Sequence, residues 1–500
     1  MPRLPEPFKA MFKMGSENYK SFPNEIFNVY AKCEEEDYYD ISNHPFTGDY
    51  VRNDKSVNCT FNIISPTNTY SSGGTIHVIG YGSRMYKKLS FGIKFDKKFL
   101  GRKSIKMRAM ASDPTFIRER LSTELFRAVG VPVQEGAYAR LFINGDNYGL
   151  YFLIDNISSR WIKSYIHGDT KAKIGVSYQM VSSQPDGPYS DLKYKGENLR
   201  SPYKLDEYDD EDFKPGDEDS KWKYLIDFTR MYDQWVKTYG EDNSNKAIEE
   251  LKKFLNIECT LRLMAIESLI LALDNFWLVS SNTVIYYNPE RKNYQFIPFD
   301  FDQALVGSKG VKTISENYMK DCVTWVNNDE AIYEHYFTNN LLKHPQIRER
   351  YEVILAKTID ETFNPDVISS YVHTFADFIR EDVEWSFDLI DLLNTEYDGR
   401  INHFTLEEFE GNLDYTPISY NKTIREDDVE FGIIEWVEKR SNGCRMSTAH
   451  IDVSKNENIS DNVNIEAFVE SDDTSGSVCI FNLKTTILFA LAQFVIFLVI

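Results

Sequence analysis

Three aspartates and an asparagine lie close together in an otherwise apolar part of this sequence. Asp274 ends an apolar run, Asn282 follows it, and Asp300 and Asp302 are separated by a single residue. Residues two apart on an extended strand point to the same side, so Asp300 and Asp302 could meet one ion. Carboxylates with a neutral amide oxygen suit Mg²⁺ or Mn²⁺ carrying nucleotide phosphates. The pattern is typical of phosphoryl transfer, in which metal ions neutralise the phosphates and a carboxylate orients the attacking hydroxyl.

A purely structural interpretation of these carboxylates stays open at this point. Asp274 could simply end a helix, and Asp300 and Asp302 could occupy an ordinary turn after a strand. That interpretation has to explain why unpaired charges border aromatic residues such as Phe299 and Phe301, because an uncompensated charge in apolar surroundings is unfavourable. From residue chemistry alone, a metal site and a turn are about equally supported.

Hydrophobic periodicity predicts the elements that position these residues. A helix is expected to end near Leu273 and to deliver Asp274 to a loop. Two strands, TVIYY and YQFIP, surround an Asn-Pro turn and deliver Asp300 and Asp302 at the far end of a hairpin. After about residue 222, apolar residues recur every three or four positions, which predicts a mainly helical second half.

The first part of the chain is expected to be rich in β-structure. Short segments over about 26–110 alternate apolar and polar residues, which is the pattern of an antiparallel sheet. A helix is predicted to follow, with Asp113 as its N-cap and Gly130 as its stop. Asn144 and Gly145 tolerate a positive φ, so they predict the turn of a hairpin.

Phosphates would need cations from this first part. The segment GYGSRMYKK could place backbone amides and Lys87 or Lys88 over a nucleotide, although an exposed strand end is an equally good interpretation.

Lys106 and Arg108 share one face of the strand that precedes the predicted helix. We expect Lys106, or Arg108 in its place, to contact phosphates, with Glu119 or Asp155 as the ion-pair partner. The alternative for each of these residues is a surface ion pair of about 0 to 1 kcal/mol.

Composition limits the class of protein. The 500 residues, 42% of them hydrophobic, can form one large domain or two closely packed lobes. Acidic side chains (77) outnumber basic ones (56), which gives a formal charge of -21. Such a surface repels nucleic acid, which is therefore not expected as a partner. The acidic segment 204–221 is expected to be a solvated surface insertion rather than part of the core.

The six cysteines fit no zinc-ligand spacing. If the chain is secreted, Cys33 could pair with Cys59, and Cys322 with Cys444. Cys259 lies in a predicted helix and is expected to be a buried apolar residue rather than a nucleophile.

The two ends of the chain give different indications about localisation. Small residues at 475–477, a spacer and an uncharged run over 487–500 match the order of a GPI attachment signal. A tail anchor beginning near Val478 is the alternative. The start shows no hydrophobic signal-peptide segment, so we expect one upstream. Four glycosylation sequons agree with secretion. They are at Asn58, Asn156, Asn421 and Asn458.

Two long blocks resemble the CotH kinase family, known from bacterial spore coats and fungal cell-surface proteins. They are KMRAMASDPTFIRERLSTELFRAVGVPVQEGAYARLFINGDNYGLYFLID and LDNFWLVSSNTVIYYNPERKNYQFIPFDFD. The resemblance covers about residues 26–400. It implies an α+β, atypical secretory-kinase-like fold in which ATP binds between a β-rich N-lobe and a mainly α C-lobe, and protein Ser or Thr hydroxyls are phosphorylated.

The resemblance also implies roles for individual residues. Asp274 matches the catalytic aspartate, Asn282 the asparagine that follows it, and Asp300 with Asp302 the Asp-x-Asp metal motif. The host-binding segment of some fungal members is not matched, since LVSSNTVIYYN stands in its place.

We therefore expect an extracytoplasmic protein serine/threonine kinase that uses ATP with Mg²⁺ or Mn²⁺. It would act on secreted or cell-surface proteins and be held at the membrane by a GPI anchor. The alternative is a surface adhesin or invasin-like protein on an inactive kinase scaffold, with a host or cell-wall ligand. The expected regions are an N-terminal segment (1–25), the N-lobe (26–165), an acidic insertion (166–222), the C-lobe with the site (223–450), an acidic flexible stalk (451–477) and a hydrophobic GPI-type signal (478–500).

Overall fold

The computed structural model describes most of the chain. The described residues are 2–183, 186–209, 212–214, 216–305, 320–327, 333–393, 395–418, 430–455, 457–460 and 468. The chain divides into two units, Met1–Phe468 and Val469–Ile500, and the second lies outside the described residues. The predicted GPI-type signal and most of the predicted stalk therefore lie outside the described residues. Within the described part, no helix combines the length and the apolar character that crossing a membrane requires.

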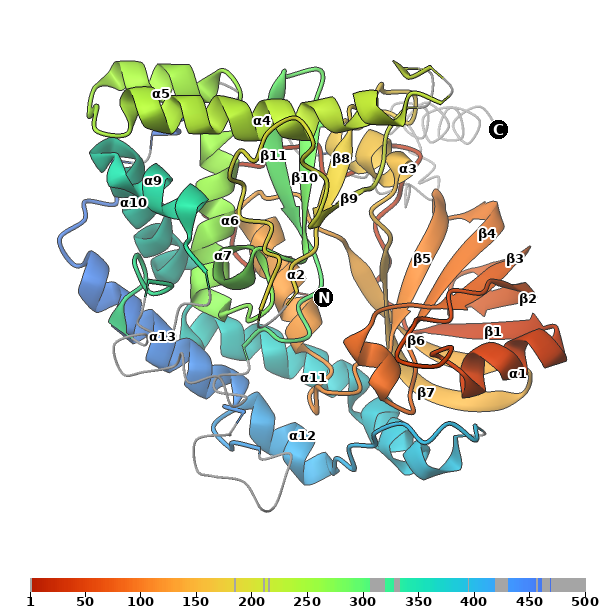
Figure 1. Cartoon of the computed structure of the whole chain (residues 1–500). Helices are drawn as coiled ribbons and strands as arrows, with labels where there is room; N and C mark the ends of the chain where they lie inside the picture. Colours follow the sequence, from red (N-terminus) through yellow and green to blue (C-terminus); the bar gives the residue numbers. More distant parts are fainter. Residues whose placement is uncertain are drawn as a thin grey trace, which may run out of the picture. The chain divides into compact units, whose positions relative to one another are not determined.

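Seven strands near the beginning of the chain close into a barrel in the order β1-β2-β3-β4-β5-β7-β6 (Figure 1). They are β1 (Phe27–Cys33), β2 (Val57–Ile64), β3 (Thr69–Val78), β4 (Phe91–Phe99), β5 (Arg102–Arg108), β6 (Gly136–Ile143) and β7 (Asp146–Asp155). The expected β-rich first part is present, but it is not wholly antiparallel, because β1 and β6 pair in parallel and close the barrel. Asn144 and Gly145 form the turn before β7 with φ of 53° and 96°, as predicted.

The two faces of β5 serve different cores. Ile105 and Met107 are buried with the barrel's own apolar cluster. Lys106 and Arg108 alternate with them, so these two basic side chains leave the barrel on its outer face. There they oppose Ile154 of β7 and its neighbours, which belong to the large core of the helical region.

Helix α2 (Arg118–Ala128) begins later than the sequence predicted. The helix was expected to start directly after Asp113, but Phe116 has a left-handed φ of 57°, which interrupts helical geometry. Asp113 still accepts a hydrogen bond from the backbone N–H of Arg118 at 3.0 Å. The end is as predicted, with Gly130 at a φ of 77°.

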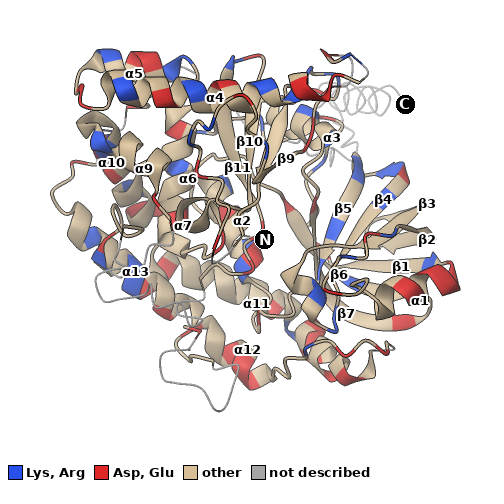
Figure 2. Cartoon of the chain, viewed as in Figure 1, with Lys and Arg blue, Asp and Glu red and all other residues tan. Residues whose placement is uncertain are grey.

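The remainder of the described chain is mainly helical. Its helices are α3 (Ser159–Trp161), α4 (Glu218–Tyr239), α5 (Asn245–Lys252), α6 (Ile257–Ile270), α7 (Phe276–Val279), α9 (Tyr336–Lys343), α10 (Pro345–Glu361), α11 (Pro365–Asp388), α12 (Leu406–Leu413) and α13 (Ile433–Thr448). Basic and acidic side chains are interspersed along α4 and α5 (Figure 2). The protein is thus mixed, with a β-rich first region and a helical second region.

A second sheet of four strands carries the predicted hairpin. Its order is β11-β10-β8-β9. The strands are β8 (Ser177–Met180), β9 (Tyr203–Leu205), β10 (Thr283–Asn288) and β11 (Asn293–Pro298). The expectation that 204–221 is entirely a solvated insertion is wrong, because β9 and the first turn of α4 extend into it.

The disulfide predictions are confirmed. Cys33 and Cys59 are directly opposite each other on β1 and β2 and are bonded. Cys322 is bonded to Cys444 of α13. Cys259 is a free, buried thiol. Burial raises the pKa of this thiol, which makes it a poor nucleophile.

Candidate active site

Asp274 lies in the short loop between α6 and α7, where the sequence predicted it. One carboxylate oxygen, Oδ2, accepts hydrogen bonds from Nδ2 of Asn282 at 2.9 Å and from Nε2 of Gln303 at 3.3 Å. The other oxygen, Oδ1, is buried and has no hydrogen-bond partner in the described part of the chain. Burial, followed by the negative charges of Asp302 and Asp300, raises the pKa of Asp274 well above its ordinary value. These three aspartates therefore act on one another in a single site.

Arg108 reaches the same site from the barrel. Its guanidinium forms a bidentate ion pair with Asp300, in which Nη1 donates to Oδ2 at 2.9 Å and Nη2 donates to Oδ1. The same Nη2 lies 3.6 Å from Asp302 and 3.7 Å from Glu119 of α2. One guanidinium nitrogen is thus in contact with three carboxylates.

The pKa values of Glu119 and Asp300 are shifted in opposite directions in this site. Burial raises the pKa of Glu119 to about 7, since the positive charge of Arg108 only partly offsets burial and the nearby aspartates. Burial alone would also raise the pKa of Asp300, but the charge and hydrogen bonds of Arg108 hold it below its ordinary value. Asp300 is therefore ionised in the site at neutral pH.

A turn, not a strand, brings Asp300 and Asp302 together. Strand β11 ends at Pro298, and Asp300 has a left-handed φ of 63°. The prediction that strand alternation aligns the two carboxylates is therefore wrong, because a turn brings them together instead. The backbone N–H of Phe301 donates to Oε2 of Glu119 at 2.9 Å, which fixes the turn against α2.

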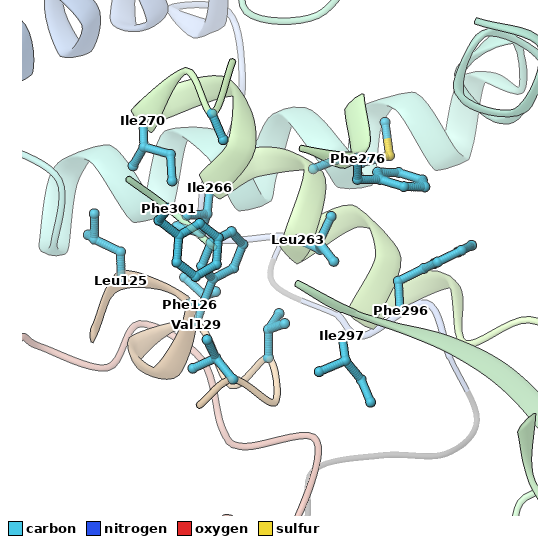
Figure 3. Close-up of a cluster of buried hydrophobic side chains, with 14 of the residues drawn as sticks. Leu125, Phe126, Val129, Leu263, Ile266, Ile270, Phe276, Phe296, Ile297 and Phe301 are labelled. Atoms are coloured by element: carbon cyan, nitrogen blue, oxygen red, sulfur yellow. The ribbon is translucent and has the colours of Figure 1, made fainter. Parts of the chain in front are cut away.

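Phe301 anchors this turn in the core between two helices. Its ring stacks on Phe126 with centroids 4.9 Å apart. Figure 3 shows it among side chains of α2 and α6, namely Leu125, Phe126, Val129, Leu263, Ile266 and Ile270. The apolar residue of the Asp-x-Asp pattern is thus a structural anchor that holds the carboxylates on either side.

Lys106 places a second basic group beside the acids. Its Nζ lies 5.4 Å from the centre of the Phe299 ring. Burial lowers the pKa of Lys106, while the negative charges of Asp300, Asp206 and Glu119 oppose that effect. Among the described residues, its ammonium has no carboxylate within ion-pair distance.

Comparison with known proteins agrees with this geometry. A family model described as CotH kinase protein matches residues 76–441, which contain all of the site residues named so far in this subsection. The chain belongs to this CotH kinase protein family. Invasin CotH2 of Rhizopus delemar is 26% identical over 342 residues, which are 68% of this chain and 54% of that protein.

Other CotH relatives carry different names. Spore coat protein homolog 1 of Rhizopus delemar is 27% identical over 339 residues, 66% of this chain and 50% of that protein. Inner spore coat protein H of Bacillus subtilis is 21% identical over 299 residues, 59% of this chain and 74% of that protein. This CotH family member thus spans about half the length of the two Rhizopus relatives.

One predicted residue of this CotH family member, Asp155, lies elsewhere. It opposes Ile105 in the register of β5 and β7. It pairs with Arg102. Of the two predicted partners, Glu119 is the one near Arg108, at 3.7 Å, and it shares that guanidinium with Asp300 and Asp302.

The lysines of GYGSRMYKK are also held outside the acidic cluster. The backbone N–H of Lys87 donates to the carbonyl of Arg400 at 3.0 Å, and its side chain makes no ion pair with a described carboxylate. The Nζ of Lys88 is buried and donates to the carbonyl of Leu150 and to Oγ of Ser386. The structure brings neither ammonium group to the three aspartates.

The donor types suit a divalent metal ion. Asp300 and Asp302 could supply carboxylate oxygens, and Asn282, whose Nδ2 is used by Asp274, could supply its amide oxygen. Among the described residues, no group of three His, Cys, Asp or Glu side chains is placed so that it could hold a metal ion. Arg108 donates to both oxygens of Asp300. A cation at Asp300 would replace at least one of these contacts.

Sequence reasoning missed two residues of the site. Gln303 bonds Asp274, and its position directly after the Asp-x-Asp pattern was the available signal. Asp206 follows β9 and acts electrostatically on Lys106. No local signal marked Asp206, because it lies in a segment rich in aspartate and glutamate.

Proposed function

We propose that this CotH family member is a protein kinase that transfers the γ-phosphate of ATP to serine or threonine hydroxyls. The observation that carries the proposal is the buried Oδ1 of Asp274, which has no hydrogen-bond partner among the described residues and lies beside Asp300, Asp302 and the basic groups of β5. A buried carboxylate oxygen without a donor is unfavourable unless a ligand supplies one. A substrate hydroxyl is a donor of this kind.

Each residue then has a distinct task. Asp274 accepts the hydroxyl hydrogen at Oδ1 and orients the nucleophile, while Asn282 and Gln303 hold its Oδ2. Lys106 binds phosphate oxygens with its ammonium group. Asp300, Asp302 and the amide oxygen of Asn282 would hold Mg²⁺ or Mn²⁺, which supplies charge neutralisation on the phosphates when bound. Arg108 links this site to Glu119 and thus to α2.

We place the reaction in the secretory pathway or at the cell surface, on secreted or surface proteins. The two disulfides support an oxidising compartment. Relatives named as an invasin and as spore coat proteins support an exposed location. A GPI anchor remains the proposal for membrane attachment, from the pattern of residues 475–500.

A second candidate function is adhesion on an inactive scaffold. It is supported by the names of invasin relatives and by the ion pair of Arg108 with Asp300. In such a protein the acidic site would be a structural ion-pair cluster, and binding to a host or wall ligand would use another surface.

The test is phosphate transfer from ATP labelled at the γ-position by the purified chain with Mg²⁺ or Mn²⁺. We expect Asp274→Asn to lower transfer by about 100-fold or more, the usual contribution of a catalytic acid or base. Its thermal unfolding temperature should not fall, since the change removes a buried charge. Asp377→Asn, on an exposed part of α11 with 68% of its side chain accessible, is the matched control.

Equal transfer by wild type and Asp274→Asn would show that Asp274 does not orient the substrate hydroxyl. No transfer by wild type, together with binding to cells that survives Asp274→Asn, would favour adhesion.

A further inference from the structure

We infer that Gln303 is a positioning residue that fixes the orientation of the Asp274 carboxylate toward the substrate. The inference rests on the proposed function of Asp274. Gln303 comes directly after Asp302 and is half-buried. Its Nε2 donates to Oδ2 of Asp274 at 3.3 Å.

Gln303 belongs to a segment that is paired with the loop of Asp274 along the main chain. The backbone N–H of Leu273 donates to the carbonyl of Gln303 at 3.3 Å. The backbone N–H of Leu305 donates to the carbonyl of Ile270 at 2.7 Å. These main-chain hydrogen bonds fix the distance between the two segments. They therefore keep the Gln303 side chain within reach of the Asp274 carboxylate.

The two oxygens of Asp274 are in unequal surroundings. Oδ2 receives two amide donors, whereas Oδ1 is buried and receives none from the part of the chain that the structure describes. The terminal torsion of an aspartate is broad, so the plane of the carboxylate can turn. Two donors to the same oxygen restrain this plane and leave the other oxygen in the position that a hydroxyl would approach.

Asn282 holds the carboxylate from the other segment of the site. Its Nδ2 has two hydrogens and donates to the backbone carbonyl of Asp274 at 3.1 Å and to Oδ2 at 2.9 Å. Nε2 of Gln303 has Oδ2 as its acceptor among the hydrogen bonds of the described residues. Gln303 is thus the second amide that restrains the carboxylate, and the one that comes from the Asp300–Asp302 turn.

The position of Gln303 also connects two parts of the site. Asp302 and Gln303 are consecutive, so a shift of the Asp300–Asp302 turn moves the donor that holds Asp274. The structure therefore couples the carboxylates proposed for metal to the carboxylate proposed for the hydroxyl group. This coupling needs no contact between the carboxylates themselves.

Gln303→Leu keeps the approximate side-chain length and removes the donor. We expect kcat of phosphate transfer to fall about tenfold, since small errors of alignment have large effects on rate. The KM for ATP should stay within about twofold, because Gln303 touches no residue proposed to bind phosphate. Gln346→Leu, the same change on the exposed surface of α10, is the matched control and should leave kcat unchanged.

A merely structural role would lower the thermal unfolding temperature without a selective loss of kcat. An unchanged kcat in Gln303→Leu, or a rise in KM that accounts for the whole loss of kcat/KM, would overturn the inference.

A double-mutant cycle tests the contact without any assay of phosphate transfer. In the wild-type background, we expect Gln303→Leu to lower the unfolding temperature by about 2 °C. In an Asp274→Leu background this effect should disappear, because the acceptor is gone. Equal effects in both backgrounds would show that Gln303 does not hold Asp274, and would overturn the inference. Absence of transfer by wild type would instead refute the proposed kinase, while the cycle would still decide the contact.

Discussion

Replacing Lys88 by methionine should stabilise the protein at neutral pH. Lys88 is 4% exposed and has no carboxylate partner among the residues that the structure describes. Its Nζ donates to the carbonyl of Leu150 at 2.7 Å and to Oγ of Ser386 at 3.0 Å. Its ammonium also lies near the rings of Phe116 and Tyr151. Methionine retains an unbranched side chain that can fill the same space.

The expected magnitude follows from the pKa. Burial lowers the pKa of Lys88 from 10.5 to about 7. Between these pH values the unfolded chain binds a proton that the folded chain lacks, so the free energy of unfolding rises with pH. At about 1.4 kcal/mol per pH unit, burying this amine destabilises the folded protein by about 5 kcal/mol at pH 7 and below. Losing two hydrogen bonds of about 1 kcal/mol each leaves a net gain of about 3 kcal/mol for Lys88→Met.

The assay is unfolding in guanidinium chloride, followed by tryptophan fluorescence at pH 7, 8 and 9 with the disulfides intact. The advantage of Lys88→Met should shrink by about 1.4 kcal/mol per pH unit and nearly vanish by pH 9. Lys87→Met, which removes the neighbouring and half-buried lysine, controls for the loss of a positive charge. A Lys88→Met protein that is less stable than wild type at pH 7, or a difference that is constant with pH, would refute the reasoning.

Two further predictions concern the site and the cross-links. Lys106→Met should raise the Kd for ATP by about tenfold, the loss of one charge-assisted contact, without lowering the unfolding temperature. Calorimetric titration of ATP would check this, and unchanged affinity would exclude Lys106 as a phosphate ligand. Replacing Cys322 and Cys444 by serine should lower the free energy of unfolding by about 2 to 5 kcal/mol. In denaturant unfolding the loss should exceed that from replacing Cys33 and Cys59, because the bonded residues are separated by 122 positions rather than 26.

Local patterns in the sequence determined the elements around the site. The end of the apolar run placed Asp274 in a loop after α6, and the strand-like segments on either side of the Asn-Pro turn predicted β10 and β11. The Asn144–Gly145 turn was predictable for the same reason, since it depends on backbone preferences of two adjacent residues. Where the local pattern failed, at the start of α2, the cause was a left-handed Phe116 that helix propensity does not reveal.

Only the tertiary structure decided which charges meet. Arg108 and Asp300 are separated by 192 residues, and no local sequence pattern around either residue predicts their ion pair. Asp155 pairs with Arg102, whereas Glu119 lies near Arg108. Residue types and spacing could thus predict which acidic, amide and basic side chains belong to the site. Their partners depend on which faces the packed core turns toward one another, because Coulomb and hydrogen-bond energies depend on distances in space and not on separation along the chain.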